Sequence, residues 1–224
     1  MQRNDMEIQR DIVDELKWEP SVRDDDVAVA VREGVVTLAG FVDSFADKWR
    51  AESVVGKVRG VKGIANDLEV KLPSTSTRTD PELARAALAA LKWDISVPED
   101  RIKVKVEKGW LTLEGDVEWY SQRAAAERAV RRLTGLRGVS NALVVRVRPV
   151  KGDVKERIKD SLQRWAQFDA DRISVDIAGN KAILRGTVRS YAEKRDAEWA
   201  AHRAPGVTEV DNRLTIDTSV YAAV

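Results

Sequence analysis

The stretch GVVTLAG, Gly34–Gly40, occurs three times in this chain in slightly different forms. The second copy is GWLTLEG, Gly109–Gly115, and the third is GNKAILRG, Gly179–Gly186. The closing glycines are 75 and then 71 residues apart, and the same two offsets align apolar residues on both sides of the stretch. Glycines and apolar residues that recur together at a fixed period indicate several copies of one small folded unit.

The difference of four residues between the two offsets falls in the segments that join the copies. The first segment, LPSTSTRTDP (Leu72–Pro81), is rich in Ser, Thr and Pro, as linkers are. The second, RPVKGD (Arg148–Asp153), is shorter. The sequence therefore predicts three tandem repeats over residues 1–72, 79–148 and 153–218, which we call repeats 1, 2 and 3.

The hydrophobic pattern of repeat 1 predicts a helix followed by two strands. Ile8, Ile12 and Leu16 lie four residues apart, as on one face of a helix. Apolar residues then alternate with others over residues 27–31 and again over residues 36–42, which is the period of a half-buried strand. The short segment over residues 32–34 fits a hairpin turn between these strands.

A second helix and a last strand follow in each repeat. In repeat 1, SFAD (Ser44–Asp47) has the spacing of a helix capping box, and a final apolar alternation covers residues 64–70. A strand–helix–strand crossover places its two strands in parallel. We therefore predict an α+β fold of three tandem two-layer units, each helix–strand–strand–helix–strand with two helices packed on a three-stranded mixed sheet.

The glycines and asparagines of the repeated motif are interpreted as structural. A phosphate-binding glycine loop opens a helix, whereas Gly34–Gly40 spans a turn and an apolar strand. We expect the strand glycine to let a helix approach the sheet closely, and a second glycine to end the second helix in a left-handed conformation. The structural motif comprises Gly40, Gly115 and Gly186, then Gly60, Gly135 and Gly206, and finally Asn66, Asn141 and Asn212.

The chain resembles the BON domain family of bacterial proteins. The resemblance rests on the strand motif G-V-V-T-L-x-G-x-V over Gly34–Val42 and on the motif G-V-x-x-I-x-N-x-L-x-V over Gly60–Val70. The second motif recurs over Gly135–Val145 and Gly206–Ile216. The resemblance implies a non-catalytic module that binds phospholipid or helps to maintain membranes under osmotic stress. It also implies relatives that are often exported to the periplasm.

Composition argues against an enzyme and against a metal or cofactor site. The chain has no Cys and a single His, His202, which we expect on the exposed face of a helix. Nucleophilic triads and transition-metal sites need several such residues. We therefore predict no catalytic residue, no metal and no cofactor. The charged N-terminal segment has no apolar core like that of a secretory signal, so we expect a cytoplasmic protein.

The charge of the chain is unevenly distributed. Residues 1–72 carry a net charge of −4, residues 73–148 a net charge of +4 and residues 149–224 a net charge of +1. Because the overall charge is balanced, we do not expect nucleic acid as a partner. The GXXG segments Gly60–Gly63 and Gly135–Gly138 each join a helix to a strand, whereas the GXXG loop of a KH domain joins two helices. The basic middle repeat favours an anionic surface instead.

The second helix of repeat 2 is the predicted lipid-facing element. Its arginines point away from the apolar stripe, and aromatic residues stand at its start, where membrane interfaces favour them. The candidate residues are Trp119, Tyr120, Arg123, Arg128, Arg131 and Arg132. The competing interpretation is a solvated arginine face, with Trp119 packed between repeats.

The remaining tryptophans divide into two groups. Trp18 and Trp93 occupy one repeated position after the first helix, and Trp165 lies one position later in repeat 3. We expect these residues to cover a sheet edge or pack on a neighbouring repeat. Trp49, Trp110 and Trp199, like Trp119, do not repeat, so partner-specific contacts are expected there.

Two functions follow from these observations. The first is a stress-associated binding protein that meets an anionic phospholipid membrane through the basic middle repeat. The alternative is a scaffold whose repeats bind one another or another protein, because repeats of net charge −4 and +4 attract.

Overall fold

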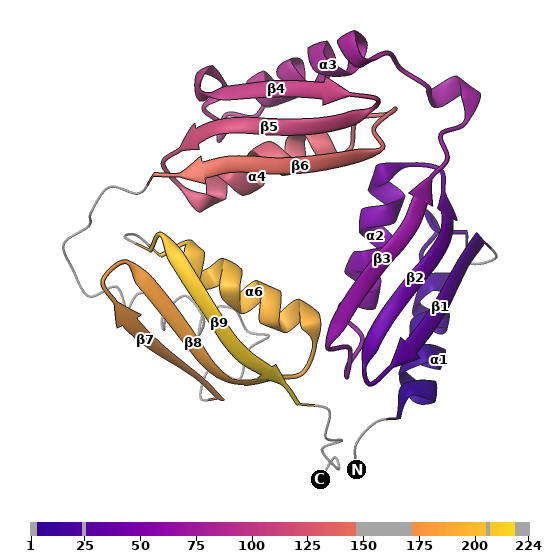
Figure 1. The fold of residues 1–224 in the computed structure, drawn as a ribbon, viewed down its shortest axis with the longest axis vertical. Coiled ribbons are helices and arrows are strands. Elements are labelled where there is room, and N and C mark those ends of the chain that lie inside the picture. The colour runs from indigo at the N-terminus through magenta and orange to yellow at the C-terminus, as the bar shows by residue number, and fades with distance from the viewer. Residues whose placement is uncertain (1–3, 24–25, 147–171, 205–206, 218–224) are drawn as a thin grey trace. The chain divides into compact units, whose positions relative to one another are not determined.

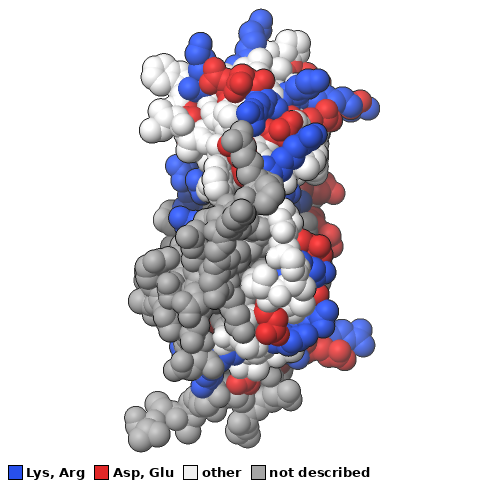
Figure 2. All heavy atoms as spheres, turned by 90° about the vertical axis from the view of Figure 1, so that its left-hand side faces the viewer, with Lys and Arg blue, Asp and Glu red and all other residues white. Residues whose placement is uncertain are grey.

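The computed structural model describes residues 4–23, 26–146, 172–204 and 207–217. Within these residues the chain forms three separate three-stranded sheets (Figure 1). In each sheet the strand that is second in sequence lies in the middle. The face of the molecule drawn in Figure 2 carries Lys and Arg side chains interspersed with Asp and Glu side chains.

Repeat 1 has the predicted order of elements. They are α1 (Asp5–Lys17), β1 (Val27–Arg32), β2 (Val35–Val42), α2 (Phe45–Val55) and β3 (Gly63–Val70). β1 and β2 are antiparallel neighbours, and β3 is on the other side of β2. The stripe Ile8, Ile12 and Leu16 is buried, as the helical spacing predicts.

Repeat 2 repeats this order with one short 3-10 helix added, and a second short 3-10 helix, η2 (Ser74–Ser76), lies in the linker before it. The elements of repeat 2 are α3 (Asp80–Trp93), η3 (Glu99–Arg101), β4 (Ile102–Glu107), β5 (Trp110–Val117), α4 (Tyr120–Arg131) and β6 (Gly138–Val145). β4 and β5 are antiparallel, whereas β5 and β6 are parallel. The crossover through α4 accounts for the parallel pair, because a single helix returns the chain to the same end of the sheet.

The described part of repeat 3 contains the same sheet and the second helix. Its elements are β7 (Ile173–Ala178), β8 (Lys181–Val188), α6 (Tyr191–His202) and β9 (Glu209–Ile216). β7 and β8 are antiparallel, and β8 and β9 are parallel. The first helix predicted for this repeat, together with Gly206, lies outside the described residues.

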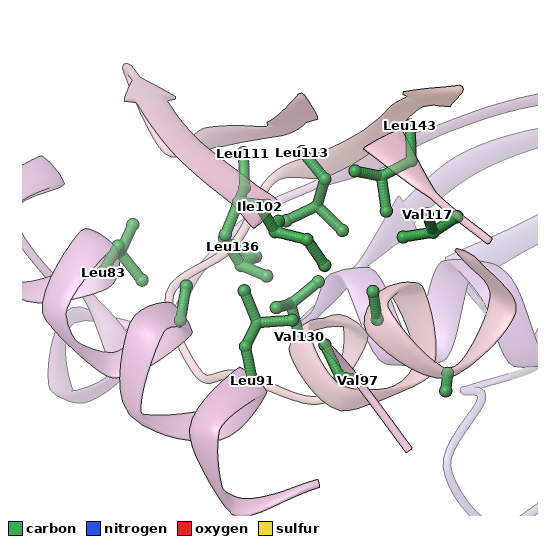
Figure 3. Packing of buried hydrophobic residues seen from close by; sticks show 13 residues of the cluster. Leu83, Leu91, Val97, Ile102, Leu111, Leu113, Val117, Val130, Leu136 and Leu143 are labelled. Carbon is green, nitrogen blue, oxygen red and sulfur yellow. The ribbon is translucent and has the colours of Figure 1, made fainter. Parts of the chain in front are cut away.

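The core of repeat 2 lies between its sheet and its two helices (Figure 3). The alternating residues of β5 that point toward the helices are buried, and so is the stripe of α3. Complete burial of each leucine stabilises the fold by roughly 1.5–3 kcal/mol. The largest fully buried side chains of this core are Leu83, Leu91, Leu111, Leu113 and Leu136.

An aspartate on the first helix holds the hairpin turn in repeats 1 and 2. Asp80 accepts hydrogen bonds from the backbone N–H groups of Lys108 (2.8 Å) and Gly109 (2.8 Å). Asp5 accepts the equivalent bonds from Glu33 (2.7 Å) and Gly34 (2.9 Å) in repeat 1. Both turn residues have positive φ, as in a type I′ hairpin, so their N–H groups point together at one carboxylate.

The repeated asparagine joins the last strand to the second helix. Asn141 Nδ2 donates to Glu127 Oε2 (3.1 Å) and to the carbonyl oxygen of Arg123 (2.9 Å). The same amide-to-carboxylate bond links Asn66 to Glu52 (3.0 Å) and Asn212 to Glu198 (3.0 Å). Since each asparagine is only partly exposed, these bonds satisfy its polar amide at the edge of the core.

The strand glycine makes a different contact from the one predicted. A Cβ atom at Gly40, Gly115 or Gly186 would overlap the carbonyl oxygen of the residue just before the antiparallel neighbouring strand. That oxygen belongs to Asp26, Arg101 and Arg172 respectively. The prediction that a helix approaches at this glycine is therefore wrong. The close neighbour is the backbone leading into the edge strand, and each of the three glycines also has positive φ.

The second helices end earlier than the glycine pattern predicted. α2 ends at Val55 and α4 at Arg131, whereas Gly60 and Gly135 lie four or more residues beyond. Both glycines do have positive φ, so the left-handed conformation is confirmed while the capping role is wrong. The residues between helix and glycine form tight turns that return the chain to the sheet.

The substitution Gly115→Ala is expected to destabilise the protein by about 3 kcal/mol, because a methyl group meets the Arg101 carbonyl oxygen and the positive φ is strained. Urea denaturation of the full chain, followed by circular dichroism, measures the effect. The control is Gly63→Ala, whose methyl group meets only Val35 side-chain atoms at 3.9 Å or more and is expected to be neutral. Equal stability of the two variants would contradict this account.

Candidate functional site

The aromatic residues predicted to face lipid stand at the start of α4. Trp119 is the N-cap residue and is 42% exposed, and Tyr120, the first helical residue, is half-buried. Gln122 Oε1 accepts hydrogen bonds from the backbone N–H groups of Glu118 (2.9 Å) and Trp119 (3.1 Å). This amide reaches back to the backbone at the helix start, where repeats 1 and 3 have a serine cap.

Arg123 is tied to the sheet of its own repeat. Its Nη2 donates to the carbonyl oxygen of Asn141 (3.1 Å), and its guanidinium carbon lies 5.7 Å from the centre of the Tyr120 ring. The side chain is half-buried, and its Nε is buried with no hydrogen-bond partner in the structure. Arg123 therefore joins α4 to β6, and a contact with lipid at this residue stays a prediction.

The other arginines lie at the C-terminal end of α4. Arg128 and Arg132 are exposed, and Arg131 is half-buried. With a rise of about 1.5 Å per residue, Arg128 is about 14 Å along the helix from Trp119. The predicted residues consequently form two separate groups along α4. Trp119, Tyr120 and Arg123 are in the first group, and Arg128, Arg131 and Arg132 are in the second.

The end of α3 presents an apolar surface beside Arg128. Trp93 is 86% exposed and Ile95 is fully exposed, although Leu91 before them and Val97 after them are buried. Lys92 is exposed in the same turn. Arg128 is close enough to Asp94 to act on it electrostatically, which places a basic residue from α4 at this end of α3.

Asp94 shapes this turn. Its Oδ1 accepts hydrogen bonds from the Ser96 hydroxyl (2.5 Å) and from the Ser96 backbone N–H (3.0 Å). These bonds lower the pKa of Asp94, the hydroxyl having the largest effect and Arg128 a small one. The turn directs Trp93 and Ile95 away from the core, and we call Lys92, Trp93, Ile95 and Arg128 the α3-end surface.

Comparison with protein-family models identifies the family of this chain. The BON domain model matches residues 4–71, 79–147 and 151–218. The chain belongs to the BON domain family. The resemblance seen in the sequence motifs is thus confirmed, and the three matches follow the three structural repeats in order.

This BON protein is similar to one curated protein over part of its length and has weak similarity to two solved structures. Over 131 residues the chain is 30% identical to osmotically-inducible protein Y of Escherichia coli K12, covering 55% of this chain and 63% of that protein. The chain thus matches less than two thirds of the length of this relative. Its similarity to CdsD, a structural protein of the type III secretion system of Chlamydia trachomatis, has a TM-score of 0.26 at 16% identity and covers 93% and 91% of the two chains. Its similarity to the PrgH periplasmic domain has a TM-score of 0.22 at 9% identity and covers 85% and 95%.

The structure corrects the interpretation of the repeated tryptophans. Trp18 and Trp93 were expected to cover a sheet edge or pack on a neighbouring repeat. Each is 86% exposed, so neither covers the edge of its own sheet. Trp165, one position later in the corresponding part of repeat 3, lies outside the described residues. The repeated position of Trp93 predicted a packing role, but α3 ends at this residue and the apolar stripe of α3 ends at Leu91.

Ile95 was missed by the sequence reasoning. It follows Leu91 by four residues, so helical spacing alone would have placed it in the core. A comparison of the repeats could have singled out Ile95, because the equivalent positions in the other two repeats are Pro20 and Ala166.

The remaining observations on this BON protein concern His202, metal-ligand groups and membrane-spanning helices. His202, predicted to be exposed, is half-buried at the end of α6. Within the described part of the chain, no three His, Cys, Asp or Glu residues are grouped so that they could hold a metal ion. No helix in that part is both long and apolar enough to cross a membrane.

The substitution Ser96→Ala is expected to raise the pKa of Asp94 toward its ordinary value, because it removes the hydroxyl bond that lowers this pKa most. A lowered pKa means that the ionised carboxylate favours the folded state. This contribution is present above the ordinary pKa and is lost as the pH falls through the folded one. Carbon-13 NMR titration of the carboxyl group measures the shift.

Arg128→Gln is the control for this titration, and its effect should be smaller, since Arg128 is the weakest of the causes. An Asp94 pKa that does not respond to Ser96→Ala would argue against the turn described above.

Proposed function

We propose that this BON protein is a non-catalytic, stress-associated protein that binds anionic phospholipid surfaces through repeat 2, with the α3-end surface as the point of contact. The observation that carries the proposal is the exposure of Trp93 and Ile95 next to the exposed Lys92, with Arg128 near enough to act electrostatically on Asp94 between them. Stress association is supported by the family and by the name of the Escherichia coli relative, an osmotically inducible protein.

The residues of the α3-end surface suit the boundary between water and lipid. Tryptophan favours the membrane interface, and an exposed isoleucine gains from leaving water. A basic residue near an anionic surface adds about 1 kcal/mol. Lys92 precedes the apolar pair in the chain, and Arg128 is near enough to act electrostatically on Asp94. Repeat 2 as a whole carries 14 Lys and Arg against 10 Asp and Glu over residues 73–148, so its net charge favours the same surface.

The α3-end surface meets these needs better than the predicted surface on α4. On α4 the exposed aromatic residue and the exposed arginines stand at opposite ends of the helix. Arg123, between them, already bonds the sheet. At the end of α3, in contrast, apolar and basic side chains come from one turn and from the neighbouring helix.

Repeat 1 provides an internal comparison. Trp18 is as exposed as Trp93 and follows Lys17, as Trp93 follows Lys92. Repeat 1 nevertheless has Pro20 in place of Ile95 and a net charge of −4 over residues 1–72. An anionic membrane should therefore repel the tryptophan of repeat 1 and attract that of repeat 2.

Vesicle flotation tests the proposal. The full chain is mixed at low salt with vesicles of phosphatidylglycerol and phosphatidylcholine, or of phosphatidylcholine alone, and floated on a density gradient. We expect flotation with the anionic vesicles. The double variant Trp93→Ala, Ile95→Ser is expected to reduce the bound fraction tenfold or more, because two apolar side chains that each contribute roughly 1.5–3 kcal/mol are lost.

Trp18→Ala is the matched control and should bind like the unchanged protein. Trp119→Ala separates the two candidate surfaces of repeat 2. If Trp119→Ala abolishes flotation and the double variant does not, α4 is the contact, as the sequence first indicated. Absence of flotation with anionic vesicles at low salt rules out the membrane proposal.

The second candidate function is a protein scaffold. It is favoured by one observation, the equal exposure of Trp18 and Trp93 at equivalent positions, since exposed tryptophans also anchor protein contacts. Size-exclusion chromatography with light scattering, at low and high salt, detects self-association. In that case Trp18→Ala and Trp93→Ala should both shift the mass toward a monomer, whereas the membrane proposal expects no change.

A further inference from the structure

The sheet of repeat 2 carries an aromatic side chain on the face that points away from its helices. Residues of β5 alternate, so Leu111 and Leu113 are buried while Trp110 and Thr112 lie on the opposite face. We call this second face, with its exposed positions on β4, β5 and β6, the open face of repeat 2. Trp110 is 50% exposed there.

The indole of Trp110 is held across the neighbouring strand. Its Nε1 donates a hydrogen bond to the Ser140 hydroxyl at 2.8 Å. At the other end, its six-membered ring fills the space above Gly138, where an added Cβ atom would overlap the ring carbons. Trp110 and Gly138 are register partners in the parallel ladder, and Ser140 is two residues along β6. The ring is therefore fixed on the side of β6, and its remaining surface faces solvent.

The fold does not require a tryptophan at this position. Repeat 1 has Val35 with Gly63 and Ala65 at the three equivalent positions. Repeat 3 has Lys181 there, whose Nζ lies 2.6 Å from Glu209 and 3.6 Å from Asp211. The same sheet accepts a small apolar set, an ion-paired set or the aromatic set, so Trp110 is a specialisation of repeat 2.

Hydrogen-bonding groups of balanced charge lie on β4, the strand on the other side of β5 from the indole ring. Glu107 is the register partner of Trp110 on β4, and Lys105 is the partner of Thr112. Lys105 Nζ and Glu107 Oε2 are 3.3 Å apart, and both side chains are exposed. The surroundings thus provide an ammonium donor, a carboxylate acceptor and a hydroxyl without a net charge, which does not favour a polyanion such as nucleic acid.

We propose that the open face of repeat 2 binds a carbohydrate, with a sugar ring stacked on Trp110 and its hydroxyl groups bonded to Lys105, Glu107 and Thr112. A pyranose ring presents C–H groups of slight positive charge on one face, and these match the negative face of an indole. Its hydroxyl groups project around the rim, where they need both donors and acceptors. An indole that is already immobilised loses little conformational entropy when the sugar binds. This site is independent of the proposed membrane contact.

NMR of the full chain tests the site. The indole N–H signals are followed while cellohexaose, maltohexaose or chitohexaose is added up to about 10 mM, which detects dissociation constants near 1 mM. We expect at least one of these sugars to shift the Trp110 signal in a saturable manner. Adenosine is added in a separate titration, to detect a site that prefers a planar base.

Four variants define the contact. Trp110→Val introduces the residue of repeat 1 and is expected to weaken binding tenfold or more. The double variant Trp110→Lys, Gly138→Glu introduces the ion pair of repeat 3, which keeps the sheet folded without the indole. Gly138→Ala retains the tryptophan but displaces its ring, and it should weaken binding as strongly. Trp93→Ala, in the same repeat but away from this face, should bind sugar normally.

Circular dichroism confirms that each variant is folded. The proposal is overturned if none of the three sugars shifts the Trp110 signal, or if adenosine binds and the sugars do not. Sugar binding that survives in the folded double variant would also overturn it. Because no vesicle is present, a failure here is distinct from a failure of the membrane proposal.

Discussion

Each three-stranded sheet in this protein is covered on one face, by two helices in repeats 1 and 2 and by α6 in the described part of repeat 3, so it buries that face and leaves the other exposed. Everything that the repeats share follows from the buried face. The inward positions of the middle strand are buried in all three copies, where they meet the helices that cover the sheet. These positions are Val36, Leu111 and Ala182, then Leu38, Leu113 and Leu184, and lastly Val42, Val117 and Val188.

Two contacts outside this core recur in all three repeats, and each involves a backbone or side-chain amide group that would otherwise contact water. The repeated asparagine bonds a helix carboxylate in every repeat. The strand glycine gives room to a carbonyl oxygen that a side chain would displace. Both contacts recur in all three repeats, because each needs one particular residue type, an amide side chain in the first case and the absence of a Cβ atom in the second.

Positions outside the core are free to differ, and they carry the individuality of each repeat. The residues equivalent to Trp110 change from valine to tryptophan to an ion-paired lysine without a change of fold. The turn after the first helix likewise presents Trp93 with Ile95 in repeat 2, and Trp18 with Pro20 in repeat 1. The two proposed binding surfaces both use positions of this kind, one at the end of a helix and one on the open face of a sheet.

The number of repeats, the order of their elements, the family and most of the core could be predicted from the amino-acid sequence alone. Periodicity reports which face of a strand or helix is buried, and the three copies reinforce one another at each position. It could not place Trp93, Ile95 or the neighbour of Gly115, since each depends on where the chain turns and on which backbone group comes close. The tertiary structure was needed to show that Trp119 and the exposed arginines lie at opposite ends of α4 and that Arg123 bonds to β6. It was also needed to show that Arg128 acts electrostatically on Asp94 at the end of α3. These outcomes arise from packing between elements distant in sequence, which no local pattern records.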